Sequence, residues 1–186
     1  HTDPANLVTV RTLSHAAVQW PSRAARANLV PRSDDSHSSL SWSDEHAALL
    51  GQPLDTRAHR QLGFAFSDGA LIWLEDGRVA DALALPGLNE AAAETWCDGH
   101  LASAGLSTTA AAQMPYTLDP VSYAGLAGAD APLLTLGAWF SAAQTALDAL
   151  VLAHGSIAVA PPSVRWRSTR DSTLATSRAK RIVSSA

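Results

Sequence analysis

Two Asp-Gly pairs, Asp68-Gly69 and Asp76-Gly77, stand in the middle of the chain between apolar runs. The apolar residues are Phe64 and Phe66 before the first pair, Leu71 to Leu74 between the pairs, and Val79 to Leu85 after the second. Asp-Gly suits a two-residue hairpin, because the turn needs positive φ and glycine adopts positive φ without a Cβ clash. The sequence therefore predicts a three-stranded antiparallel meander over about 61–85.

Helical and strand-like patterns surround this meander. We expect helices over 7–19, 22–29, 89–103 and 133–153, a short helix over 120–127, paired strands near 40–42 and 47–50, and a last strand over 157–160. Pro21 is expected to end or kink the first helix, and Asn89 to cap the third. The order of these elements predicts an α+β fold, in which helices pack on one face of an antiparallel sheet.

The composition excludes several classes of protein. With 186 residues, of which 47% are apolar and 16% charged, the chain can bury a core, and we expect one domain over 1–166. A net charge of −4 argues against a sequence-independent nucleic-acid binder. The single cysteine, Cys97, rules out an internal disulfide and fits a reduced, cytoplasmic setting. No apolar run reaches the roughly 18 residues of a membrane span, so we expect no membrane association.

The C-terminal part has a different charge from the rest. From Arg165 onward, six basic residues accompany one acidic residue, Asp171. We expect residues 167–186 to form a flexible basic tail, which needs no binding role of its own.

The densest polar clusters are Asp34-Asp35-Ser36-His37 and Asp44-Glu45-His46. Imidazoles and carboxylates are ligands of zinc, manganese and iron, and catalytic sites leave positions open for water. If 38–43 is one strand of a hairpin, both clusters converge in one hollow beside His15. The candidate catalytic residues are therefore His15, His37, His46 and Asp44, and the candidate ligands of a divalent metal are Asp35, His37 and His46. The alternative is that both clusters are solvated turns.

Two functions from different classes remain open. The first is a small hydrolase, in which a metal-bound or base-activated water attacks an ester-like substrate. The second is a non-catalytic module, whose sheet and long helix enclose a small-molecule ligand or a partner chain. A seam formed by Trp139 and Phe140 on the long helix would make the chain a homodimer.

Short motifs along the chain form a recognisable order: Thr12-Leu13-Ser14-His15, Val30-Pro31, His37 to Trp42, Gly51-Gln52-Pro53-Leu54 and Gly105-Leu106. Together they resemble an uncharacterised family of bacterial proteins, common in actinobacteria and catalogued as a domain of unknown function. The resemblance covers residues 7–166, and it implies an α+β fold with no assigned activity.

The C-terminal part departs from that family. The family continues a proline-rich stretch with Trp-Pro-His-His-Phe-Asp, whereas here Trp166 is followed by Arg167-Ser168-Thr169. We hypothesise that the residues after about 166 arise from a change of reading frame, so that any site built from those histidines is missing.

Overall fold

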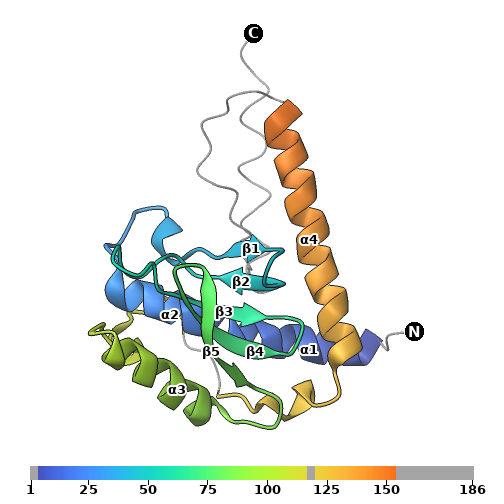
Figure 1. Ribbon diagram of the computed structural model, residues 1–186. Coiled ribbons are helices and arrows are strands. Elements are labelled where there is room, and N and C mark those ends of the chain that lie inside the picture. Colours follow the sequence, from blue (N-terminus) through green and yellow to red (C-terminus); the bar gives the residue numbers. More distant parts are fainter. Residues whose placement is uncertain (1–3, 117–119, 154–186) are drawn as a thin grey trace.

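Five strands form one antiparallel sheet in the order β1-β2-β3-β4-β5, so each strand pairs with its neighbours in the sequence (Figure 1). The computed structural model describes residues 4–116 and 120–153. The strands are β1 (Ser41–Ser43), β2 (Ala48–Leu50), β3 (Gln61–Ala65), β4 (Ala70–Glu75) and β5 (Arg78–Ala84). The predicted meander is confirmed as β3, β4 and β5, and the predicted strand pair before it as β1 and β2.

The two Asp-Gly pairs form turns of different lengths. The β4–β5 turn consists of Asp76 and Gly77 alone, with φ angles of 48° and 76°, as expected for a two-residue hairpin. The β3–β4 turn is longer than predicted, because Ala65 pairs with Ala70 and four residues lie between them. Phe66 is the first of these four, and its ring is buried with 1% exposed, so core packing rather than turn chemistry sets the length of this loop.

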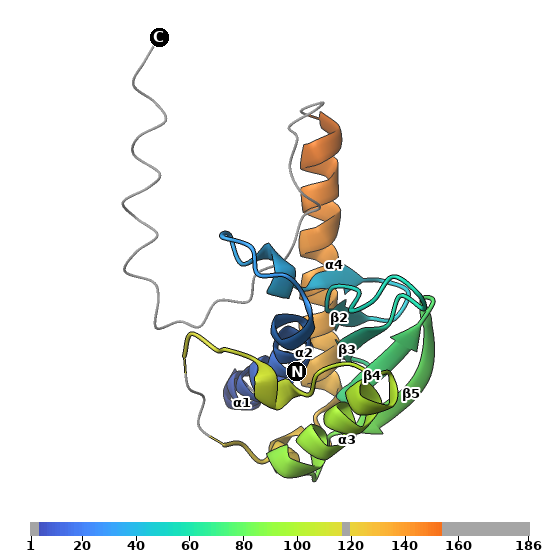
Figure 2. The same cartoon turned by 90° about the vertical axis from the view of Figure 1, so that its left-hand side faces the viewer.

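The helices lie on one face of the sheet, which confirms the predicted α+β fold. They are α1 (Pro4–Ala17), α2 (Gln19–Asn28), α3 (Glu90–Ser103) and α4 (Asp130–Ala153), with short 3-10 turns η1 (Ser36–Ser38), η2 (Thr109–Ala111) and η3 (Tyr123–Leu126). All four α-helices contribute to one apolar core, which also holds Phe64 and Leu71 of the sheet. Figure 2 shows α1, α2 and α3 to one side of the strands. Asn89 caps α3 as expected, accepting a hydrogen bond from the Ala92 N–H.

A smaller cluster lies on the opposite face of the sheet and consists of Ala48, Ala65, Ile72 and Leu74, with Leu50 beside it. His46 in the β1–β2 turn places its Nε2 3.2 Å from the Gly77 carbonyl oxygen in the β4–β5 turn. These two turns belong to hairpins on either side of β3, so their contact curls the sheet over the small cluster. Position 63, in the middle of β3, favours glycine, because a Cβ there would lie 3.1 Å from the backbone carbonyl oxygen of Leu49.

The first helix ends earlier than predicted. α1 ends at Ala17 and α2 begins at Gln19, so the break lies at Val18 rather than at Pro21. Pro21 occupies the first turn of α2, where a proline is tolerated because its missing N–H would have no partner within the helix. The proline therefore helps to begin the second helix instead of ending the first.

The last described helix, α4, begins in the core and then leaves it. Its first turns bury Leu133 and Leu136, whereas every residue from Thr145 to Ala153 is exposed. Figure 1 and Figure 2 both show this second half rising past β1, away from the other helices and strands. α4 has 24 residues and contains an 18-residue window with a mean hydropathy of 1.3, so it is long and apolar enough to cross a membrane by those two measures alone. The expectation of no membrane association is not tested by this helix and stays a prediction.

Three predictions lie outside the described residues: the strand over 157–160, the flexible tail over 167–186 and the change of reading frame after 166. The single domain over 1–166 stays a prediction for the same reason.

Candidate functional site

His37 lies buried at a hollow between the end of α2 and the segments around η1 and η2. Its side chain is only 6% exposed. The ring Nδ1 accepts a hydrogen bond from the backbone N–H of Arg32 at 3.2 Å. In a neutral ring this leaves the proton on Nε2, so the second ring nitrogen is a hydrogen-bond donor.

Arg26 lies in the last turn of α2 and forms an ion pair with Asp35, with 3.2 Å between Nη2 and Oδ1. The Arg26 side chain is 16% exposed, whereas the Asp35 side chain is 55% exposed. The Nε atom of Arg26 is buried and has no hydrogen-bond partner among the described residues. An unpaired buried donor costs about 1–3 kcal/mol and is rare in folded proteins, so this N–H is a polar group that the described part of the fold leaves unsatisfied.

These side chains line a hollow of about 350 Å³, here called the arginine pocket. Its lining residues are Arg26, Pro31, Arg32, Asp35, His37, Ala111 and Gln113. The lining holds two guanidinium groups and one carboxylate, so it is locally positive on a chain whose overall charge is −4. Its volume falls at the lower end of the roughly 300–1,000 Å³ typical of small-molecule sites.

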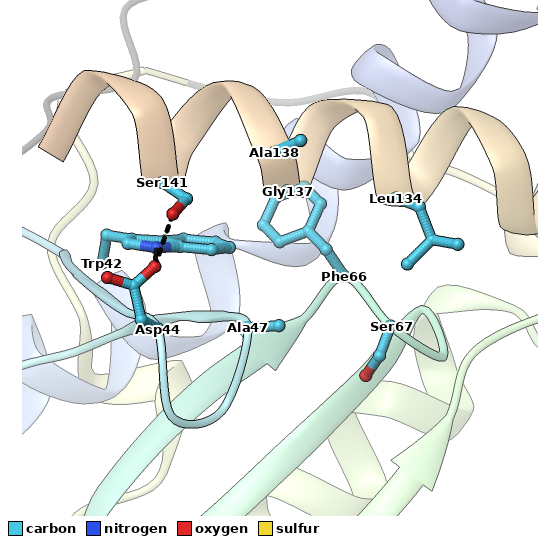
Figure 3. A pocket seen from close by; sticks show the side chains of 9 residues that line it. All are labelled: Trp42, Asp44, Ala47, Phe66, Ser67, Leu134, Gly137, Ala138 and Ser141. Atoms are coloured by element: carbon cyan, nitrogen blue, oxygen red, sulfur yellow. Dashed lines mark hydrogen bonds between the residues drawn. The ribbon is translucent and has the colours of Figure 1, made fainter. Parts of the chain in front are cut away.

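A second hollow of about 250 Å³, here called the tryptophan hollow, lies between α4 and the β1–β2 hairpin (Figure 3). Its lining residues are Trp42, Asp44, Ala47, Phe66, Ser67, Leu134, Gly137, Ala138 and Ser141. Asp44 Oδ1 accepts hydrogen bonds from Trp42 Nε1 at 2.7 Å and from Ser141 Oγ at 2.6 Å. The bond from Ser141, and then the bond from Trp42, lower the pKa of the Asp44 carboxyl.

The polar groups of the tryptophan hollow already serve the fold. Asp44 joins the β1–β2 turn to α4 through Ser141, and the Trp42 ring stacks on Phe140 of α4 with centroids 5.6 Å apart. Phe140 is thus half-buried against the sheet. Of the two residues predicted to form a dimer seam, Trp139 and Phe140, Trp139 is the exposed one, at 56%. This hollow anchors α4, whereas Arg26, which lines the arginine pocket, has an Nε that finds no partner among the described residues.

The two remaining histidines of the candidate set lie elsewhere. His46 belongs to the β1–β2 turn and donates from Nε2 to the Gly77 carbonyl oxygen. His15 lies on α1 with its Nε2 3.3 Å from the side-chain nitrogen of Gln19. Burial, and then the nearby charge of Arg11, lower the pKa of His15.

The structure does not bring the predicted site residues into one hollow. His37 and Asp35 line the arginine pocket and Asp44 lines the tryptophan hollow, while His15 and His46 line neither of the two. Over residues 4–116 and 120–153, no three His, Cys, Asp or Glu side chains are grouped to hold a metal ion, so the ligand set Asp35, His37 and His46 is wrong. The physical reason is that β1 spans only 41–43, and residues 36–38 form a 3-10 turn that packs against α2.

No pattern in the sequence distinguishes Arg26, Arg32 or Gln113 from other polar residues. Arg26 follows Arg23 on a polar helix, and nothing in that pattern distinguishes the buried guanidinium from a solvated one. The one available signal was local: Arg32 precedes the Asp35-Ser36-His37 cluster, so a tight turn could place its backbone against the His37 ring.

Comparison with known proteins finds no matching family model, no matching curated protein and no matching solved structure. The resemblance to a bacterial family therefore stays a prediction.

Proposed function

We propose that this chain is a binding module for a small anionic molecule, whose carboxylate or phosphate group occupies the arginine pocket. The observation that carries the proposal is the buried Nε of Arg26, which has no partner in the part of the chain that the structure describes. An anionic oxygen in the pocket would interact with the guanidinium of Arg26, whose side chain is 16% exposed, and would satisfy the Nε donor when the side chain turns that atom toward the ligand.

The other donors of the pocket suit the same ligand chemistry. The Nε2–H of a neutral His37, the guanidinium of Arg32 and the side-chain amide of Gln113 belong to one lining. Guanidinium groups match the planar, two-oxygen geometry of carboxylates and phosphates. Pro31 and Ala111 supply the apolar part of the wall, which favours a ligand with a small hydrocarbon portion.

Binding is better supported than hydrolysis at this pocket. A histidine that acts as a general base usually has one ring nitrogen held by a carboxylate and the other directed at a nucleophile or a water. The hydrogen bond found on the His37 ring comes instead from the Arg32 backbone N–H. His37 therefore acts as a fixed donor toward the ligand, and the carboxylate of the pocket, Asp35, is paired with Arg26.

Isothermal titration with inorganic phosphate and with acetate tests the proposal on the wild-type chain and on Arg32→Gln. We expect saturable binding to the wild type and an affinity at least about tenfold lower for Arg32→Gln, because a charge-assisted hydrogen bond is worth about 1.5–3 kcal/mol. The variant leaves the backbone N–H that holds His37 unchanged.

The matched control is Arg57→Gln, which removes the same charge from an exposed arginine that does not line the pocket. Its affinity should stay close to that of the wild type, because exposed charges at a distance are screened by salt. Equal losses in the two variants, or no saturable binding of either anion, would contradict the proposal.

A further inference from the structure

The lining of the arginine pocket holds charges of both signs. Arg26 and Arg32 bring positive guanidinium groups, whereas Asp35 brings a negative carboxylate. A ligand with carboxylates alone would match the two cations but would meet a like charge at Asp35, which is unfavourable at close range. The complement of this lining is a molecule with two negative groups and one positive group.

The backbone fixes the position of Asp35 in this lining. Its N–H donates a hydrogen bond to the Arg32 carbonyl oxygen at 3.0 Å, and its own carbonyl oxygen accepts one from the Ser38 N–H at 3.1 Å. Its φ of 59° is a left-handed conformation that aspartate adopts more readily than most residues. The carboxylate therefore extends from a defined turn, and at 55% exposed it is accessible to a group in the pocket.

Arg26 and Asp35 are neighbours of opposite charge, with 3.2 Å between Nη2 and Oδ1. The ammonium and carboxylate groups of an α-amino acid are also neighbours of opposite charge, because both are attached to one carbon. Such a ligand can place its carboxylate against the Arg26 guanidinium and its ammonium against the Asp35 carboxylate, so that every charge has a partner. A ligand without the ammonium would compete with Asp35 for its cation and offer the carboxylate no replacement.

Arg32 brings the second guanidinium to the same lining. Once Arg26 and Asp35 are matched by the two groups of an amino acid, the charge of Arg32 is the one that remains in the lining. A carboxylate on the side chain of the ligand would match it, and guanidinium groups bind carboxylates well. The volume of about 350 Å³ keeps that side chain short, since it lies near the lower limit for small-molecule sites.

We infer that the ligand of the arginine pocket is an acidic α-amino acid of the size of aspartate or glutamate. The inference rests on the proposed function and makes it more specific. The α-carboxylate contacts Arg26, the ammonium contacts Asp35 and the side-chain carboxylate contacts Arg32. Asp35 is then the residue that selects an amino acid over a simple dicarboxylate, because a ligand that lacks the ammonium meets its unmatched charge.

Isothermal titration of the full chain with L-aspartate and with succinate tests the inference. The two molecules differ by one amino group, since aspartate is succinate with an ammonium on one carbon. The wild type should bind aspartate at least about tenfold more tightly, because the contact with Asp35 adds a charge-assisted hydrogen bond. Binding of succinate as tight as that of aspartate would overturn the inference.

Asp35→Asn should remove this preference, so that the affinities for aspartate and succinate become similar. Inorganic phosphate is titrated into the same variant, and its binding shows that the pocket is intact. Asp68→Asn is the matched control, because Asp68 is an exposed aspartate of the β3–β4 loop that does not line the pocket. It should keep the wild-type preference for aspartate. A preference that persists undiminished in Asp35→Asn would also overturn the inference.

The failure of this inference can be told apart from the failure of the proposed function. If phosphate and succinate bind and Arg32→Gln weakens both, but aspartate binds no better than succinate, then the anion site stands and the amino acid is overturned. If phosphate, succinate and aspartate all fail to show saturable binding, both proposals are overturned.

Discussion

Arg26→Gln should reduce the affinity for inorganic phosphate at least about 100-fold, because it removes two charge-assisted hydrogen bonds worth about 1.5–3 kcal/mol each. Arg26 is the cation that the fold holds most firmly in the arginine pocket: its side chain is 16% exposed and its Nε lacks a partner within the described residues. Gln keeps two of the three side-chain methylenes and a similar helix propensity, so folding should be preserved. Titration calorimetry measures the affinity, and circular dichroism checks the fold.

Asp35→Asn is the companion variant, and it should raise the affinity for phosphate instead of lowering it. In the structure the Asp35 carboxylate occupies one edge of the Arg26 guanidinium, 3.2 Å from Nη2, where it competes with an anionic ligand. Asp35 is also 55% exposed and has a φ of 59°, a backbone conformation that asparagine tolerates well. A several-fold gain in phosphate affinity is expected. Weaker binding in Asp35→Asn, or unchanged binding in Arg26→Gln, would show that Arg26 is not the anion-binding group.

Phe66→Ala should lower the free energy of unfolding by about 3–5 kcal/mol, the range for truncating a buried phenylalanine. Phe66 is 1% exposed and contacts three other rings: Phe64 at 4.9 Å, Phe140 at 5.3 Å and Trp42 at 5.9 Å between centroids. Its loss leaves a cavity where α4 meets the sheet. Urea denaturation followed by tryptophan fluorescence and by far-UV circular dichroism measures the change.

Val79→Ala serves as the comparison for Phe66→Ala, because Val79 is 47% exposed on β5. Its effect should stay within about 0.5–1 kcal/mol, as for most surface positions. Two variants of similar stability would mean that the four-ring cluster does not hold α4 to the sheet.

The fold could be predicted to the extent that local rules decide it. Asp76-Gly77 specifies a two-residue turn wherever it stands between strands, and Asn89 supplies the side-chain acceptor that begins α3. The failures occurred where tertiary packing overrides a local rule. Phe66 lengthens the β3–β4 loop because its ring enters the core, and Pro21 begins a helix because the chain breaks earlier, at Val18.

The site could not be predicted because its parts are positioned by contacts between distant segments. The sequence predicts that His37 belongs to a site, but it favours the next polar cluster, around Asp44 and His46, as the source of its partners. In the structure η1 packs against α2, which brings His37 to Arg26 and separates it from Asp44. No periodicity in the sequence indicates whether a helical arginine is solvated or buried. The burial of Arg26 is therefore visible only in the three-dimensional structure.

The most direct test of the anion-binding account follows the His37 ring by nitrogen-15 NMR while inorganic phosphate is added. The ring lies in the lining with Nδ1 held by the Arg32 N–H and Nε2 left as a donor. The account predicts that the Nε2 signal moves saturably, with the same midpoint as the calorimetric titration, and that Arg26→Gln abolishes the shift. A His37 signal that stays in place while phosphate binds would contradict the account, because the anion would then occupy another part of the molecule.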